Sequence, residues 1–493
     1  MRLPHSAANV CERRFFLHRN VIRLGLLIRY KTVLGRLLCT REARIRHMTS
    51  PAMFTDFYEL AMLQAYFEEQ MSEPAVFSLF VRGLPPRRNY LLACGLDDVL
   101  SFLETVRFDQ AALQYLATLG CFSDRFLHYL EGLRFTGDVF AVPEGTPVFG
   151  DEPILEIEAP IAEAQFVETF VMNQIHLQTV LASKAVRVVE AAQGRQVVDF
   201  GLRRMHGLDA GLKAARAFHI AGVDATSNLA AGQRYGLRVA GTLAHSYIQA
   251  HDDEYEAFRA FARLYPDTVL LVDTYETLAG VRKVIRLARE LGADFHVSAV
   301  RLDSGDLGTL AVEARRLLDR AGLERVGIFA SGGLNEDEIA GLVRGGAPIN
   351  GFGVGSDMAV SRDVPALDIV YKLVEYGGRA RLKLSTGKVL LPGRKQVCRV
   401  ERDGIADHDV LARRDDEPCG RPLLRPVMVA GRRTEMPTLD ASRAHAQWEL
   451  NRLPRRVRQL EPAAPPYGVE ISEALVRDGG RLRRQLEREG TYS

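Results

Sequence analysis

Paired cysteines are missing from this sequence. The chain has 493 residues but only six cysteines, which are Cys11, Cys39, Cys94, Cys121, Cys398 and Cys419. None of them forms a CxxC pair or lies near a histidine at the spacing of metal ligands, which argues against a disulfide framework and a zinc site. Scattered thiols are typical of a reducing compartment, so we expect a cytoplasmic protein.

Long apolar runs and a strong net charge are also absent. No apolar run is long enough to cross a bilayer, so we expect no membrane partner. The net charge of +2 hides an asymmetry, because residues 1–47 carry eleven Lys or Arg against two Glu and leave residues 48–493 at −7. An acidic body argues against general nucleic-acid binding, but it is compatible with a local basic pocket for one anionic ligand.

Residues 1–47 form a basic leader that is poor in acid. Its composition would suit a transit peptide or a helix on a membrane surface. We instead expect Met48 to be the natural start, with the preceding residues disordered or translated from upstream DNA. Mass spectrometry of the native amino terminus tests this expectation, and a mature protein that begins before Met48 would contradict it.

The first third of the chain mixes helix and strand signals. In "FTDFYELAMLQAYFEEQ" apolar residues recur at helical spacing from Phe57 onward, and Thr55 is the predicted N-cap. The runs "AVFSLFVRGLP", "DVFAVPEGTPVFG" and "PILEIEAP" are apolar or alternating between Gly and Pro, which predicts strands over 75–85, 138–150 and 153–160.

Seven short apolar runs separated by helical stretches follow between about 195 and 360. They are "QVVDFG", "FHIAGVD", "LRVAGT", "TVLLVDT", "FHVSAVRLD", "RVGIFASGG" and "PINGFGVGS". Strands that alternate with helices indicate a parallel sheet, and so many consecutive units favour a closed α/β barrel. A doubly wound open sheet is the alternative.

Polar side chains stand at the ends of these runs. They are Arg203, Arg204, His245, Ser246, Asp273, Arg301, Asp303, Ser304 and Asp306. The loops that follow the strands of a parallel barrel share one face, and active sites lie there. Taken singly, each residue has an ordinary explanation: solvated charges for the arginines, helix caps or turns for the aspartates, and a structural role for His245.

The last two runs end in glycine turns. The first turn contains Ser331, Gly332 and Gly333, followed by Asn335 and Glu338 in the order of a capping box. The second turn contains Gly353, Gly355 and Ser356. Backbone N–H groups of such turns close on anions, and the loops after the final strands of barrels frequently bind phosphate.

Lysine is scarce, with eight among the 64 basic residues, and none stands at the end of the seven runs. A Schiff-base aldolase would need one there. The residues therefore predict a sugar-phosphate substrate and a phosphoryl or glycosyl transfer rather than carbon–carbon chemistry.

Several longer stretches follow one another along the chain: "TDFYELAMLQAY", "DFGLRR", "ATSNLAAGQRYGLRVAGTLAHSY", "LLVDTYET", "RLDSGDL", the two glycine turns, "PALDIVYKLV" and the closing "YGVEISEAL". Together they resemble nicotinate phosphoribosyltransferases. The resemblance implies that nicotinate and phosphoribosyl pyrophosphate give nicotinate mononucleotide and pyrophosphate in NAD salvage, in a reaction coupled to ATP hydrolysis with Mg²⁺. Nicotinamide or quinolinate phosphoribosyltransferases, or a non-catalytic phosphosugar-binding protein, are the alternatives.

The resemblance also implies an architecture. An N-terminal α/β domain over 48–190, completed by residues 372–493, would lie beside an irregular α/β barrel over 191–371. Family members form dimers that share active sites, so Tyr58 would stack on the pyridine ring in the partner's barrel.

The remaining roles follow from the same resemblance. Arg203 or Arg204 would bind the nicotinate carboxylate. Arg301 would neutralise phosphate charge, and Asp303 would bind the ribose hydroxyls, directly or through Mg²⁺ with Asp273. The phosphate site would comprise Ser304, Ser331, Gly332, Gly333, Gly353, Gly355 and Ser356. His245 would accept a phosphoryl group from ATP, and Ser246 would donate a hydrogen bond to that group.

Overall fold

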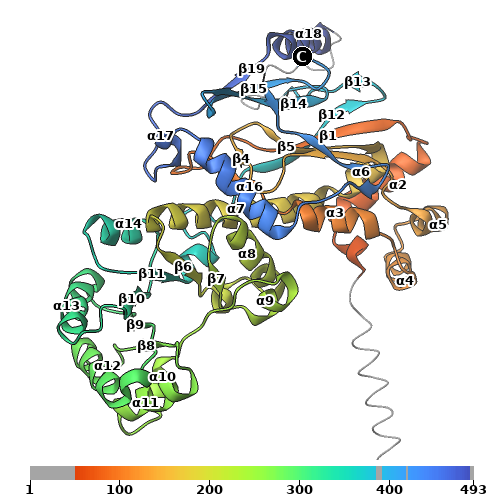
Figure 1. Cartoon of the computed structure of the whole chain (residues 1–493). Helices are drawn as coiled ribbons and strands as arrows, with labels where there is room; N and C mark the ends of the chain where they lie inside the picture. Colours follow the sequence, from red (N-terminus) through yellow and green to blue (C-terminus); the bar gives the residue numbers. More distant parts are fainter. Residues whose placement is uncertain (1–49, 385–390, 418–419, 489–493) are drawn as a thin grey trace, which may run out of the picture.

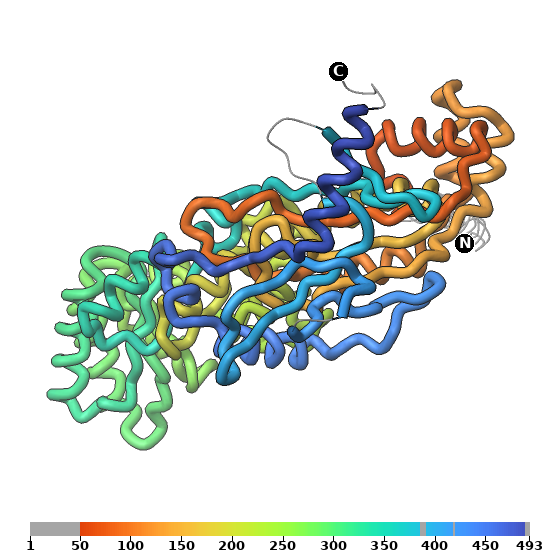
Figure 2. Tube along the Cα trace, turned by 90° about the horizontal axis from the view of Figure 1, so that it is seen from above, coloured from red at the N-terminus to blue at the C-terminus, as the bar shows by residue number. Residues whose placement is uncertain are grey.

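The computed structural model describes residues 50–384, 391–417 and 420–488. The prediction for the leader, residues 1–47, lies outside the described residues. The described chain forms two units that lie side by side, a sheet unit and a barrel unit (Figures 1 and 2). The sheet unit combines segments from both ends of the chain, coloured orange and blue, and the green barrel comes from the middle.

An antiparallel sheet of seven strands forms the centre of the sheet unit, in the order β13-β12-β1-β5-β3-β17-β18. These strands are β13 (Arg379–Ala380), β12 (Ile369–Tyr376), β1 (Pro74–Val81), β5 (Pro153–Pro160), β3 (Asp138–Ala141), β17 (Arg425–Val429) and β18 (Arg432–Arg433). Seven of the eight residues of β1 are buried, which explains its nearly continuous apolar sequence. The strands predicted over 75–85 and 153–160 are confirmed as β1 and β5, but the stretch 138–150 forms two short strands rather than one. They are β3 and β4 (Pro147–Val148), and β4 pairs with β2 (Leu91–Leu92) outside this sheet.

Helices cover the sheet and connect it to the barrel. They are α2 (Phe57–Glu68), α3 (Leu96–Thr105), α4 (Gln110–Thr118), α5 (Asp124–Gly132), α6 (Ile161–Phe166) and α7 (Glu168–Ala192). The predicted helix from Phe57 is confirmed, but its N-cap is Asp56. The Thr55 hydroxyl instead donates a hydrogen bond to the carboxylate of Glu59. The long α7 packs against β12 of the sheet and against two helices of the barrel, α8 (Leu208–Ile220) and α14 (Glu336–Arg344).

The barrel unit contains six parallel strands in the order β7-β6-β11-β10-β9-β8. They are β6 (Gln196–Asp199), β7 (Ala225–Thr226), β8 (Val269–Leu271), β9 (Ala299–Leu302), β10 (Gly327–Ala330) and β11 (Gly351–Val354). Its helices are α8 (Leu208–Ile220), α9 (Leu229–Tyr235), α10 (His245–Gln249), α11 (Glu254–Leu264), α12 (Thr277–Leu291), α13 (Leu307–Arg320), α14 (Glu336–Arg344) and α15 (Ser356–Ala359). Buried residues of α12, including Val281, Val284 and Ile285, recur at helical spacing and belong to the same buried cluster as residues of β8.

The predicted irregular α/β barrel is confirmed, but the expectation that it closes is wrong for the described residues, whose parallel strands form an open half-barrel. Val239 adds a single parallel bridge to Thr226, and within the described residues no strand ladder joins this edge to β8. Two of the seven predicted strands are wrong. Most of "FHIAGVD" is the end of α8 and the turn after it, because "LDAGLKAARAFHI" continues a helical pattern through Ile220. The run "LRVAGT" contributes only the Val239 bridge.

The C-terminal segment adds a smaller sheet in the order β16-β14-β15-β19. Its strands are β14 (Lys395–Arg402), β15 (Ile405–Arg413), β16 (Arg421–Pro422) and β19 (Gly468–Ile471), and its helices are α16 (Leu439–Arg452), α17 (Arg455–Arg458) and α18 (Glu473–Arg488). Helix α16 packs on α8 of the barrel, so the C-terminal segment contacts both units. Among the described residues, no helix is both long enough and apolar enough to cross a membrane.

Candidate functional site

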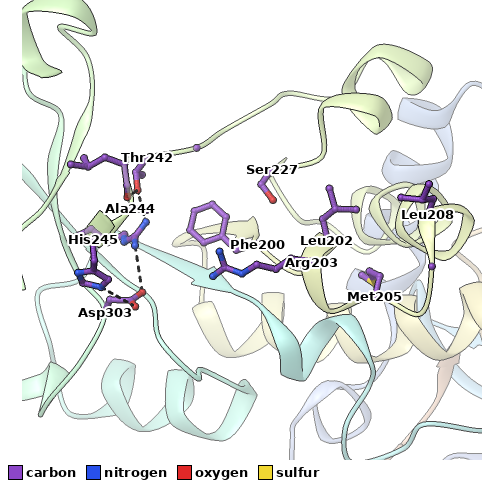
Figure 3. Close-up of a pocket in the computed structure, with 14 residues that line it drawn as sticks. Phe200, Leu202, Arg203, Met205, Leu208, Ser227, Thr242, Ala244, His245 and Asp303 are labelled. Carbon is purple, nitrogen blue, oxygen red and sulfur yellow. Dashed lines mark hydrogen bonds and ion pairs between the residues drawn. The ribbon is translucent and has the colours of Figure 1, made fainter. Parts of the chain in front are cut away.

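A cavity of about 720 Å³ opens at the carboxyl ends of the barrel strands (Figure 3). Its polar lining includes Arg203, Ser227, Thr242, His245, Arg301 and Asp303, and its apolar lining includes Phe200, Leu202, Met205 and Leu208. The loops after β6, β7 and β9, and the segment before α10, bring these side chains together from a stretch of about a hundred residues. The structure therefore brings polar side chains that follow different strands to one face of the barrel, as expected for parallel strands.

His245 is the first residue of α10, and both of its ring nitrogens have neighbours. Its Nδ1 lies 3.1 Å from Oγ1 of Thr274, and its Nε2 lies 3.8 Å from Oδ2 of Asp303. The side chain is 40% exposed, which leaves the ring accessible from the cavity. Ser246, the next residue, is exposed on α10 and is not part of the cavity lining.

Arg301, at the third position of β9, is largely buried beside the cavity. Its Nη1 donates a hydrogen bond to Thr242, its Nη2 lies 3.7 Å from Oδ1 of Asp303, and its Nε is buried without a hydrogen-bond partner. Burial lowers the pKa of Arg301 below its ordinary value, although Asp303 and Asp273 oppose this shift. A guanidinium stays charged under such a shift, so Arg301 offers the cavity a positive charge that is only partly neutralised.

Asp273, the second residue after β8, organises the turn after β9. Its Oδ2 accepts hydrogen bonds from the backbone N–H of Asp303 at 2.9 Å and from the hydroxyl of Ser304 at 2.7 Å. The N-cap of α12 is Glu276, so the ordinary interpretation of Asp273 as a helix cap is wrong. For Asp306 that interpretation is confirmed, because its carboxylate accepts from the N–H of Thr309 at the start of α13.

The first glycine turn contacts Asp303 directly. The Ser331 hydroxyl donates to Oδ1 of Asp303 at 2.5 Å. Gly332 has a φ of +92°, and a Cβ at this position would lie 1.8 Å from the carbonyl oxygen of Asp303. Only glycine fits such an approach. The predicted capping box of Asn335 and Glu338 is confirmed at the start of α14.

The second glycine turn divides into two parts. Gly353 is buried inside β11, where a Cβ would lie 2.5 Å from the ring of Phe200, so its position serves packing rather than an anion cradle. Gly355 follows the strand as the N-cap of α15, and Ser356 is the first residue of that helix. The Ser356 hydroxyl accepts a hydrogen bond from Nη1 of Arg204 at 2.7 Å, which turns Arg204 away from the cavity lined by Arg203.

Tyr58 lies in the sheet unit, on the first turn of α2, and does not line the cavity of its own chain. The side chain is 45% exposed and stands beside Phe54 and Phe57, which are also exposed. Burial, and then the carboxylates of Glu168, Glu59 and Asp56, raise the pKa of Tyr58 above its ordinary value, so the phenol stays protonated. An exposed aromatic group of this kind is available to a second molecule.

The sequence did not predict that Thr242 and Thr274 are partners of Arg301 and His245. Thr242 binds Arg301, and Thr274 binds His245. Both stand in stretches that were singled out, "GTLAHS" and "LVDTYET", but the pairings join residues 59 and 29 positions apart. The apolar side of the cavity, formed by Leu202, Met205 and Leu208, was missed as well because it follows no motif.

Together, the half-barrel, the cationic cavity and the glycine turns after its last strands define an α/β-barrel protein built to bind a phosphorylated ligand. Comparison with known families specifies this class. Residues 53–176 match the nicotinate phosphoribosyltransferase N-terminal domain, residues 181–372 the quinolinate phosphoribosyl transferase C-terminal domain, and residues 419–478 the nicotinate phosphoribosyltransferase C-terminal domain.

Full-length relatives agree with these domain matches. A nicotinate phosphoribosyltransferase of Mycobacterium tuberculosis is 55% identical over 434 residues, which cover 88% of this chain and 94% of the relative. One from Bacillus subtilis is 39% identical and covers 76% of this chain and 79% of the relative. The crystal structure of human nicotinic acid phosphoribosyltransferase is similar with a TM-score of 0.78 and 29% identity, covering 87% of this chain and 99% of the human one. The chain belongs to the nicotinate phosphoribosyltransferase family.

Proposed function

We propose that this protein transfers the phosphoribosyl group of phosphoribosyl pyrophosphate to nicotinate, forming nicotinate mononucleotide and pyrophosphate for NAD synthesis. The observation that carries the proposal is the barrel cavity with His245, Arg301 and Asp303, in a chain that is 55% identical to a nicotinate phosphoribosyltransferase over nearly its whole length. The reaction breaks the bond from ribose C1 to pyrophosphate and forms the bond from C1 to the pyridine nitrogen.

Nicotinate binds between the arginine and the apolar side of the cavity. Arg203 pairs with its carboxylate, because a guanidinium offers two parallel donors to a carboxylate. The support is that Arg203 lines the cavity together with Phe200 and Leu202, whereas Arg204 is engaged with Ser356. Arg204 then acts at the phosphate end of the site.

The phosphoribosyl group binds across the ends of β9, β10 and β11. Its 5′-phosphate lies on the N–H groups and hydroxyls of Ser331, Gly332, Gly333, Gly355 and Ser356. Gly353 supports the second turn through its packing inside β11. Asp303 accepts from the ribose hydroxyls, and Ser304 supports that loop through Asp273. Arg301 neutralises pyrophosphate charge as the oxocarbenium-like transition state forms, and the carboxylate of Asp303 favours its developing positive charge.

Mg²⁺ is the expected companion of pyrophosphate chemistry, and two carboxylates of the site suit it. Oδ1 of Asp273 is buried without a hydrogen-bond partner, and Asp303 stands next to it on the cavity side. Within the described ranges no group of three or more His, Cys, Asp or Glu side chains could hold a metal alone. Mg²⁺ is typically held by one or two carboxylates plus substrate phosphates, and when bound it stabilises the leaving pyrophosphate.

ATP hydrolysis couples to the transfer through His245. Nε2 of His245 attacks the γ-phosphorus of ATP, the bond to ADP breaks, and water later hydrolyses the N–P bond to release phosphate. The support is the hydrogen bond at Nδ1: if Nδ1–H donates to Thr274, the lone pair of Nε2 faces the cavity. A phosphoryl group there would order the neighbouring loops around Arg301, and the Ser246 hydroxyl would donate a hydrogen bond to it.

A homodimer with shared active sites would complete the cavity. Tyr58 lies outside the cavity of its own chain, on an exposed aromatic surface, so a second copy would bring it over the pyridine ring. We place the enzyme in the cytoplasm, in agreement with its scattered cysteines.

One assay tests the proposed function. Purified protein is incubated with phosphoribosyl pyrophosphate and Mg²⁺ and with nicotinate, nicotinamide or quinolinate at equal concentration, with and without ATP. We expect nicotinate mononucleotide as the main product and a faster reaction with ATP. Faster turnover of nicotinamide or quinolinate would contradict the assignment, and no product from any of the three would contradict an enzymatic function of this class.

A further inference from the structure

A cluster with equal numbers of positive and negative side chains joins the sheet unit to the barrel, next to the segments that follow the two glycine turns. Four cations meet four carboxylates: Arg87, Arg88, Lys184 and Arg187 against Glu336, Asp337, Asp357 and Asp363. We call these eight residues the interunit charge cluster. All four cations belong to the loop between β1 and β2 or to α7, and all four carboxylates follow one of the glycine turns. Each of these ion pairs therefore connects one unit to the other.

Lys184 is the member of this cluster that contacts carboxylates from both turns. Its Nζ lies 2.5 Å from Glu336, 2.6 Å from Asp357 and 3.0 Å from Asp363. The contact with Glu336 is a hydrogen bond and those with Asp357 and Asp363 are ion pairs, so one ammonium group attracts carboxylates from both turns. The Lys184 side chain is only 2% exposed, which shields these pairs from water and salt.

The charges of this buried group stabilise one another. Burial by itself would lower the pKa of Lys184, but Glu336, Asp357 and Asp363 raise it above its ordinary value. Burial would likewise raise the pKa of Glu336, but Lys184 and Arg187 lower it. Both groups therefore stay charged at physiological pH, and loss of the ammonium would leave three carboxylates without their central partner.

We propose that Lys184 is a positioning residue for the phosphoribosyl substrate, because it holds the carboxylates of both glycine turns and so fixes the spacing between them. The inference rests on the proposed function, in which these turns bind the 5′-phosphate. Glu336 is the third residue after Gly333, and Asp357 is the second after Gly355. A displaced carboxylate therefore moves its turn, and an uncompensated one repels the dianionic phosphate.

The test is a set of steady-state measurements on Lys184→Met, which removes the charge but keeps an unbranched stem. We expect the KM for phosphoribosyl pyrophosphate to rise about tenfold or more and the KM for nicotinate to change less than about twofold. The matched control is Arg87→Gln, which removes the pair with Asp337, whose two side chains are 45% and 52% exposed. Exposed pairs contribute little, so both KM values should stay within about twofold of the wild type.

A second variant keeps the inference testable if Lys184→Met does not fold. Asp357→Asn replaces a side chain that is 12% exposed and affects the second turn alone. We expect it to raise the KM for phosphoribosyl pyrophosphate about threefold or more, with an unchanged circular dichroism spectrum. An unchanged KM in either folded variant, or a parallel rise for both substrates, would overturn the role of Lys184. A wild-type protein that forms no product would instead refute the proposed function and remove the basis of this inference.

Discussion

Replacing Gly332 with alanine is the most direct perturbation of the candidate site. The Cβ would be placed 1.8 Å from the carbonyl oxygen of Asp303. Because non-bonded heavy atoms prefer separations of about 3.5 Å, the turn or the Asp303 backbone must move by roughly 1 Å or more. That movement breaks the hydrogen bond from Ser331 to Asp303 and shifts the carboxylate near His245.

The neighbouring Gly333 provides a matched control. Both glycines have positive φ, +92° for Gly332 and +71° for Gly333, but a Cβ on Gly333 meets nothing within 4 Å. Gly333→Ala therefore costs only the left-handed backbone strain, about 1 kcal/mol. Gly332→Ala adds an overpacking cost, which brings the destabilisation to about 3 kcal/mol.

Urea unfolding and initial rates together distinguish the two variants. We expect the free energy of unfolding to fall by about 2 kcal/mol more for Gly332→Ala than for Gly333→Ala. We also expect Gly332→Ala to lower kcat/KM about a hundredfold through the displaced Asp303. Equal stabilities of the two variants would refute the close approach of Gly332 to Asp303, because strain in the backbone alone would then account for both.

Three further predictions concern single side chains. His245→Ala should keep the fold and lose ATP hydrolysis, retaining at most slow transfer that ATP does not stimulate; an unchanged ATP effect in coupled ADP-release and product assays would exclude the phosphohistidine. Arg203→Gln should raise the KM for nicotinate at least about tenfold and Arg204→Gln mainly that for phosphoribosyl pyrophosphate; the reverse pattern would exchange their roles. Burial raises the pKa of Glu59 to about 7 from an ordinary 4.5. Its contribution to stability is therefore fully present below pH 4.5 and is lost as the pH rises through 7. The melting temperature should fall more between pH 5 and pH 8 in the wild type than in Glu59→Gln. An equal fall of the melting temperature in both proteins would contradict the raised pKa of Glu59.

Much of the fold was predictable from the sequence, for local reasons. The helix from Phe57, the strands around 75–81 and 153–160, and the capping box at Asn335 follow from spacing and turn chemistry. The run "FHIAGVD" predicted a strand wrongly, because Phe218 and Ile220, the last apolar residues of the amphipathic α8, resemble the start of a strand. The open edge of the barrel near Val239 could not be predicted from the sequence, because pairing between distant strands leaves no local pattern.

The candidate site was predictable in its residue types but not in its supporting contacts. Position at strand ends identified His245, Arg301 and Asp303, and the structure brings all three to one cavity. The partners that orient or neutralise groups around the site come from far along the chain, as with Lys184 and Glu336, which are 152 residues apart. Such pairs depend on how α7 packs on the barrel, which no single stretch of sequence encodes.

The order of strands in the seven-stranded sheet has a consequence for biosynthesis. β1 pairs with β5 on one side and with β12 on the other, and β3 pairs with β17, which begins at Arg425. Both β12 and β17 are therefore synthesised after the barrel. While the ribosome is still translating the barrel, the apolar eight-residue β1 and the short β3, which lie on either side of β5, both present open edges. Such edges recruit other chains, so we expect this enzyme to depend on chaperones during synthesis and to aggregate when truncated before β12.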